Sequence, residues 1–132
     1  MTELEIYTLF NSGRLVGVVS FIGSIIAIWL ALRVANLTRE NTDGNLLQKI
    51  VATAFGLLIV AGSWMSAVLA KATWVITAYN LDLLETRSTF SDNFIAYVGT
   101  TELPVTAPMP LHIVFFAVVA IMIVSIIWTP KK

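Results

Sequence analysis

The sequence of 132 residues contains no cysteine and a single histidine, His112. Without cysteine the chain forms no disulfide, offers no thiolate nucleophile and holds no iron–sulfur cluster. One histidine cannot supply both axial ligands of a bis-histidine haem. We therefore expect no cofactor and no metal site belonging to this chain alone, although its composition is compatible with bound lipid.

Charge is also scarce. Charged residues make up 12% of the chain and hydrophobic residues 58%, and the mean hydropathy is +0.86. A soluble domain is about a quarter charged. The eight basic and eight acidic residues balance, which argues against nucleic acid as a partner. Neither a glycine-rich phosphate loop nor a recognisable catalytic constellation is present, so we do not expect the chain to be an enzyme on its own.

Three long stretches carry no charge at all. They are Leu15–Leu32, Ile50–Ala70 and Ile113–Thr129, with 18, 21 and 17 residues. A helix of about 17–25 predominantly apolar residues crosses the hydrocarbon core of a bilayer. We therefore predict an all-α membrane protein with three transmembrane helices.

Polar and turn-forming residues divide the chain into segments. The short connection with Asp43-Gly44 predicts that the first two helices form an antiparallel hairpin. The second helix is longer than a bilayer needs, so we expect it to project outward. The predicted segments are an outer interfacial tail (1–12), a transmembrane helix (13–35), a cytoplasmic connection (36–45), a long transmembrane helix (46–79), an acidic outer loop (80–109), a transmembrane helix (110–129) and a cytoplasmic tail (130–132).

Local signals refine the ends of these segments. Asn11 or Ser12 is the expected N-cap of the first helix. The outer loop of 30 residues carries a short predicted helix in "STFSDNFIAYVG", with Ser91 as N-cap and Gly99 as the stop. Pro110 suits the first position of the third transmembrane helix. That helix has few small residues, and we expect it to face lipid or to contact another subunit loosely.

Basic residues predict the orientation. Five of them flank the membrane on the side of the first connection and the C-terminus: Arg33, Arg39, Lys49, Lys131 and Lys132. The opposite side has only two or three, among six acidic residues. Because Lys and Arg concentrate in cytoplasmic loops, we expect the N-terminus outside and the C-terminus in the cytoplasm. The expected location is the plasma membrane of a bacterium or archaeon.

Small residues recur at heptad spacing in the first two helices. In lipid, helices associate through close backbone approach and polar contacts, so these residues are predicted to form a packing seam between the two helices. The alternative is the ordinary abundance of small residues in membrane helices. The seam comprises Gly13, Gly17, Ser20, Ser24, Ala27 and Ala31 of the first helix, and Ala52, Gly56, Ser63, Ser66 and Ala70 of the second.

Two ionisable residues at the membrane boundary, Lys71 and His112, are the candidate functional side chains. We interpret Lys71 as reaching the headgroups, with a buried ion pair or a substrate contact as the alternative. We interpret His112 as an ordinary interfacial residue that could also contribute one ligand to a shared metal site. In the outer loop, an exposed apolar cluster is predicted to contact a partner protein. It comprises Phe90, Phe94, Ile95 and Tyr97.

These features favour a non-catalytic accessory subunit of a larger integral-membrane complex. Its expected partners are other integral-membrane subunits and membrane lipid. The sequence does not distinguish a respiratory, a photosynthetic and a membrane-oxygenase complex. The alternative function is a homo-oligomeric small channel or transporter, whose water-facing stripe would include Ser63, Ser66 and Lys71.

Overall fold

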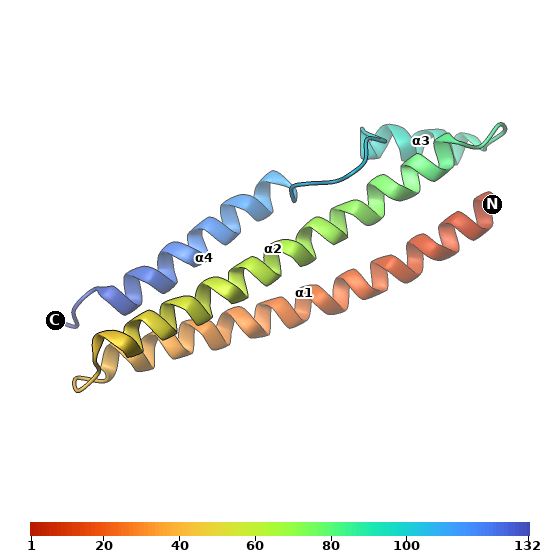
Figure 1. Cartoon of the computed structure of the whole chain (residues 1–132). Coiled ribbons are helices and arrows are strands. Elements are labelled where there is room, and N and C mark those ends of the chain that lie inside the picture. The colour runs from red at the N-terminus through yellow and green to blue at the C-terminus, as the bar shows by residue number, and fades with distance from the viewer.

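The computed structural model describes residues 1–132 and consists of four helices joined by turns and loops. They are α1 (Glu3–Glu40), α2 (Leu46–Asp82), α3 (Thr89–Val98) and α4 (Pro110–Trp128). α1 and α2 form an antiparallel hairpin along the whole molecule, with α4 beside one half and α3 beside the other (Figure 1). α1, α2 and α4 are each long and apolar enough to cross a membrane. The predicted fold class, an all-α membrane protein with three spanning helices, is confirmed.

The first helix starts at Glu3 rather than at Gly13, so most of the predicted interfacial tail is helical. Thr2 is the N-cap, because its hydroxyl accepts from the Glu5 amide while the Glu5 carboxylate accepts from the Thr2 amide. This capping box satisfies free amides at the helix start. Ser12, an expected cap, instead donates to the carbonyl of Thr8 inside the helix.

The hairpin turn follows the expectation for Asp43-Gly44. α1 ends at Glu40, and the side chain of Asn41 accepts from the Asp43 amide while its carbonyl accepts from Gly44. Asn45 then caps α2 by accepting from the amide of Gln48 at 3.0 Å. α2 begins at Leu46, as predicted, and continues three residues beyond the predicted end at position 79.

The short helix in the loop begins earlier than predicted. Ser88, and not Ser91, is its N-cap, and the Ser88 hydroxyl accepts from the amide of Ser91. Ser91 is instead the third residue of the helix and is buried, and its hydroxyl forms a hydrogen bond with the Tyr7 hydroxyl of α1. Gly99 ends the helix as predicted, with a φ of 81° that L residues rarely adopt.

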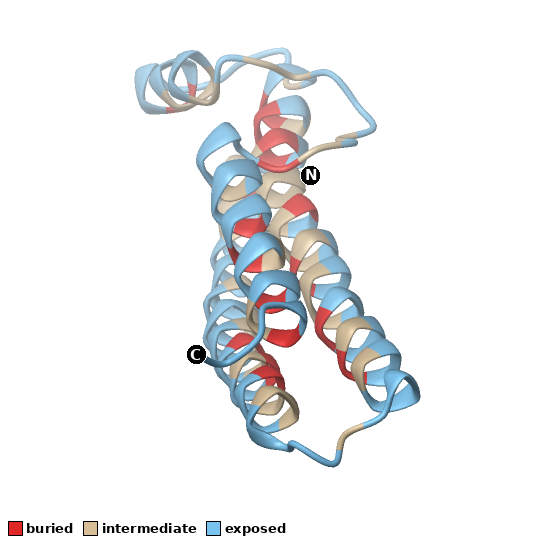
Figure 2. Ribbon diagram, turned by 90° about the vertical axis from the view of Figure 1, so that its left-hand side faces the viewer, coloured by how far each residue is buried: buried red, intermediate tan, exposed pale blue.

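The third spanning helix packs one face within the chain, which the sequence did not indicate, while its other side stays exposed, as expected for a helix that faces lipid. Its buried residues Phe116, Val119, Ile123 and Ile127 form one face against α1 and α2. In Figure 2 the buried positions lie where the three helices meet. Bulky α4 residues fit here because the hairpin supplies small partners. These are Ala31 and Ala35 of α1 and Ala52 and Gly56 of α2.

Helix lengths divide the molecule into two parts. The 19 residues of α4 span about 28 Å at 1.5 Å per residue, which matches a hydrocarbon core of about 30 Å. α1 and α2 are about twice as long. Their excess lies beyond the N-terminal end of α4, alongside α3 (Figure 1). We call this part, residues 3–12 and 74–109, the projecting module.

Candidate functional site

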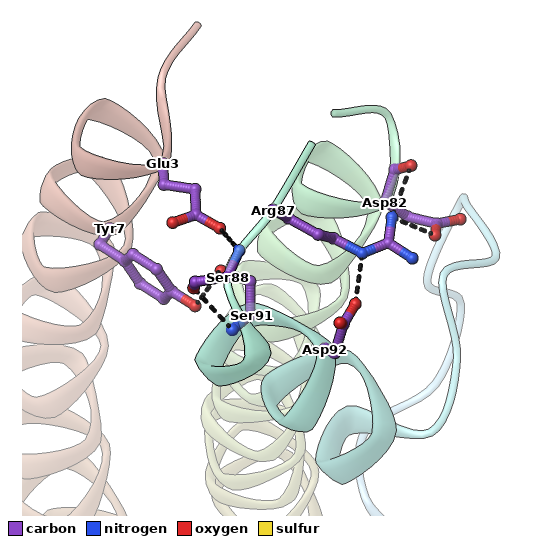
Figure 3. A network of polar contacts seen from close by, with 7 residues as sticks. All are labelled: Glu3, Tyr7, Asp82, Arg87, Ser88, Ser91 and Asp92. Atoms are coloured by element: carbon purple, nitrogen blue, oxygen red, sulfur yellow. Dashed lines mark hydrogen bonds and ion pairs between the residues drawn. The ribbon is translucent and has the colours of Figure 1, made fainter. Parts of the chain in front are cut away.

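A polar network ties the projecting module together (Figure 3). The guanidinium of Arg87 donates to the Asp92 carboxylate of α3 at 2.6 Å and to the Asp82 carboxylate of α2 at 3.2 Å. The hydrogen bond with Asp92 raises the pKa of Arg87 above its ordinary value, so this group stays charged. From α1, Glu3 accepts from the Ser88 amide at 2.7 Å. Favourable contacts of a carboxylate with the N-terminus of a helix are expected because the free amides there carry partial positive charge.

Beneath this network lies an aromatic cluster formed by α1, α2 and α3. The ring of Phe94 stacks on Trp74 with centroids 5.7 Å apart, and it meets Phe10 and Tyr7 edge-on at 5.2 and 5.9 Å. Arg14 places its guanidinium 4.9 Å from the Trp74 ring centre. Each such aromatic contact adds about 0.5–1.5 kcal/mol beyond area burial. The cluster holds α3 against the hairpin.

The four residues predicted to contact a partner divide into two pairs. Phe94 and Ile95 are half-buried within the chain. Phe90 and Tyr97 are 68% and 79% exposed and touch only the rim of the aromatic cluster, at Tyr7 and Trp74. The division follows from the helix: Phe90 and Tyr97 are seven residues apart and share one side of α3, whereas its inward face contacts the hairpin. The inward position of Phe94 was missed because the first helix was expected to start only at Gly13. Tyr7 and Phe10, three residues apart near the start of α1, are the sequence signal that could have indicated its partners.

The predicted seam is distributed over two contacts. Gly13 and Gly17 of α1 lie opposite α2. A Cβ added to Gly13 would stand 2.8 Å from Cγ2 of Thr73, and one added to Gly17 would stand 3.9 Å from Cβ of Ala70. Gly56, expected in the same contact, faces Ile123 of α4 instead. Ser20 and Ala27 line a shallow groove on the α1 and α2 surface. The small residues therefore allow two close helix contacts, of α1 with α2 and of α2 with α4.

Ser24, Ser63 and Ser66 of the seam meet His112 at a cavity of about 60 Å³ between α1, α2 and α4. Sequence reasoning treated the serines and the histidine separately, because it placed α4 away from the hairpin. The rest of the lining is apolar or small: Gly17, Phe21, Ile25, Ile28, Ala67, Ala70, Phe115 and Phe116. Residues of all three spanning helices therefore line this cavity, and its polar side chains are the three serines and His112.

Lys71 is half-buried on α2 and forms no ion pair within the chain, since both ion pairs in the structure involve Arg87. At the opposite end of the membrane part, Lys49 lies over the Trp128 ring, with Nζ 5.7 Å from its centre. Aromatic and cationic residues are typical of membrane interfaces. No three His, Asp or Glu side chains come together in an arrangement that could hold a metal ion.

The fold and these sites define a helical membrane protein with three candidate spans and a folded projecting module. No known family, no characterised protein and no solved structure matches the chain.

Proposed function

We propose that the chain is a non-catalytic accessory subunit of a larger integral-membrane complex. Its three helices associate laterally with other subunits, and the projecting module docks on an extramembrane part of the complex. In this proposal the complex resides in the plasma membrane of a bacterium or archaeon, with the projecting module outside.

The observation that carries the proposal is apolar exposure outside the membrane. Leu4 and Phe90 are 77% and 68% exposed. Gly17 of α1 lines the same cavity as His112, which lies at the N-terminal end of α4. Leu4 lies about 20 Å from Gly17 along α1, at 1.5 Å per residue. The headgroup region is only about 5–8 Å thick on each side. Lipid therefore does not cover Leu4, and a protein surface is the expected cover.

The contacts that hold α3 against the hairpin support the same role. Arg87 joins its first turn to α2 by ion pairs, and Phe94 on its inner face packs against Tyr7 and Trp74. Association pays for every side chain or loop that it must order. A helix already fixed on the hairpin presents Phe90 and Tyr97 in a defined arrangement, which suits an aromatic docking surface.

The direct test replaces both exposed aromatics, Phe90→Ala with Tyr97→Ala. Loss of aromatic anchors typically costs about 2 kcal/mol or more of binding, equal to about thirtyfold in affinity. We expect the variant to insert normally but to migrate separately from the complex on a native gel. The matched control is Asn93→Ala, at an exposed polar position of the same helix, which should remain bound.

The alternative, a channel, gives the opposite result. The purified chain would then form only homo-oligomers and conduct ions in liposomes, and Lys71→Ala would abolish the conductance. Such a result would replace the accessory-subunit proposal, because a structural subunit has no conductance to lose.

A further inference from the structure

The imidazole of His112 has a polar atom that the chain does not satisfy. Its Nδ1 is buried and has no hydrogen-bond partner, while the ring packs on Phe116 with centroids 6.2 Å apart. A buried polar group left unpaired is unfavourable, and lipid chains offer no hydrogen bond in compensation. A hydrogen-bonding molecule at this atom removes that cost.

The cavity beside His112 provides further polar partners. Ser24, Ser63 and Ser66 line it from α1 and α2. By contrast, the hydroxyls of Thr73 and Thr77 donate to the carbonyls four residues before them. The three serines offer three hydroxyl groups to the cavity, and a buried water needs two to four polar partners.

An open groove adjoins this cavity on the side of the projecting module. The groove, of about 240 Å³, shares Gly17 and His112 with the cavity and extends to Arg14 and Thr73. In the other direction, Ser63 lies seven residues along α2 from Ala70, about 10 Å deeper at 1.5 Å per residue. The groove and the cavity therefore lie next to each other along the hairpin, at successive depths.

We propose that the cavity is a water-binding site, filled from the side of the projecting module. A cavity of 60 Å³ exceeds the roughly 10–15 Å³ that one water needs and equals about two waters at the roughly 30 Å³ each occupies in the liquid. A lipid chain or a cofactor headgroup is too large, because sites for such ligands measure about 300–1,000 Å³. Water also donates and accepts, so one molecule can bond to more than one of the three serine hydroxyls.

The test uses the single histidine as a unique probe. The chain, labelled in histidine, serine and valine with ¹⁵N and ¹³C, is reconstituted in bilayers, and magnetisation transfer from water protons is measured by solid-state NMR. We expect transfer to the His112 ring and to Ser63 and Ser66 to be several-fold faster than transfer to Val118. Val118 is a labelled reference on the exposed side of α4 at similar depth. Transfer to the serines as slow as to Val118 would overturn the proposal, even if His112 alone contacts water.

A cavity-filling variant provides a second measurement. Ala67 lines the cavity, and Ala67→Leu should displace the water and slow the transfer to Ser66 several-fold. Ala61→Leu makes the same change at an exposed position of α2 and should leave the transfer unchanged. Equal transfer rates in the two variants would contradict a water site in this cavity.

Discussion

Single residues decide how closely the helices approach. A Cβ added to Gly56 would stand 2.6 Å from Cγ2 and 3.2 Å from Cδ1 of Ile123, a fully buried side chain. A Cβ on Gly62 would have nothing within 4 Å. Both glycines lie in α2, so they differ in their surroundings rather than in helix propensity.

The first prediction concerns this pair. Gly56→Ala should lower the free energy of unfolding by about 1–3 kcal/mol, because Ile123 must move in a packed core. Gly62→Ala should be neutral or slightly stabilising, since alanine favours the helix by about 1 kcal/mol over glycine. Thermal unfolding in detergent, followed by circular dichroism, compares the two. Equal midpoints would show that α4 does not pack on Gly56.

At the scale of elements, α3 depends on its inner face and on one arginine. Phe94 is the centre of the aromatic cluster, with ring partners on α1 and α2. Phe90 touches only Tyr7 among the aromatic residues. The two phenylalanines therefore have different roles although both lie on a helix of ten residues.

The second prediction follows from this difference. Phe94→Ala should destabilise the docked position of α3 by about 1–3 kcal/mol, less than a fully buried phenylalanine. Phe90→Ala should have a smaller effect on docking. Amide hydrogen exchange in α3 measures the opening. Faster exchange in Phe90→Ala than in Phe94→Ala would contradict the observed packing.

The third prediction concerns Arg87, which joins Asp82 at the end of α2 to Asp92 in the first turn of α3. Arg87→Met keeps an unbranched side chain similar to the arginine stem but removes the charge and both ion pairs. We expect faster amide exchange at the N-terminus of α3 and no change in α4. High salt should partly reproduce this effect in the unaltered chain, because exposed ion pairs are screened. Unchanged exchange in Arg87→Met would show that the ion pairs do not hold the helix.

Sequence patterns predicted the elements better than their contacts. Charge-free runs, Asp43-Gly44 and Pro110 are local signals, and the structure places spans, turn and helix start accordingly. The start of α1 was missed because the Thr2–Glu5 capping box competes with the later Asn11-Ser12 signal. The packing of α4 was missed for a different reason. A helix that is apolar all round does not indicate which side is buried, and the partner of Ile123 is a glycine on another helix.

At the scale of the whole molecule, the hairpin joins a membrane part to a projecting module (Figure 1). The positive-inside rule predicts a cytoplasmic hairpin turn and an α3 on the outer side. The fourth prediction tests this orientation with single cysteines, which a chain without cysteine allows. In intact cells, a membrane-impermeant thiol reagent should label Asn93→Cys in α3 and not Thr42→Cys in the turn. Labelling of Thr42→Cys alone would reverse the orientation.

The most direct test of the central claim, that this chain is one subunit of a larger membrane complex, is the composition of its native assembly. The chain is extracted from its own membrane in mild detergent, and native mass spectrometry measures the mass and subunits of the particle. The accessory-subunit account predicts this chain in a fixed ratio with other integral-membrane polypeptides. A particle containing only copies of this chain would contradict it.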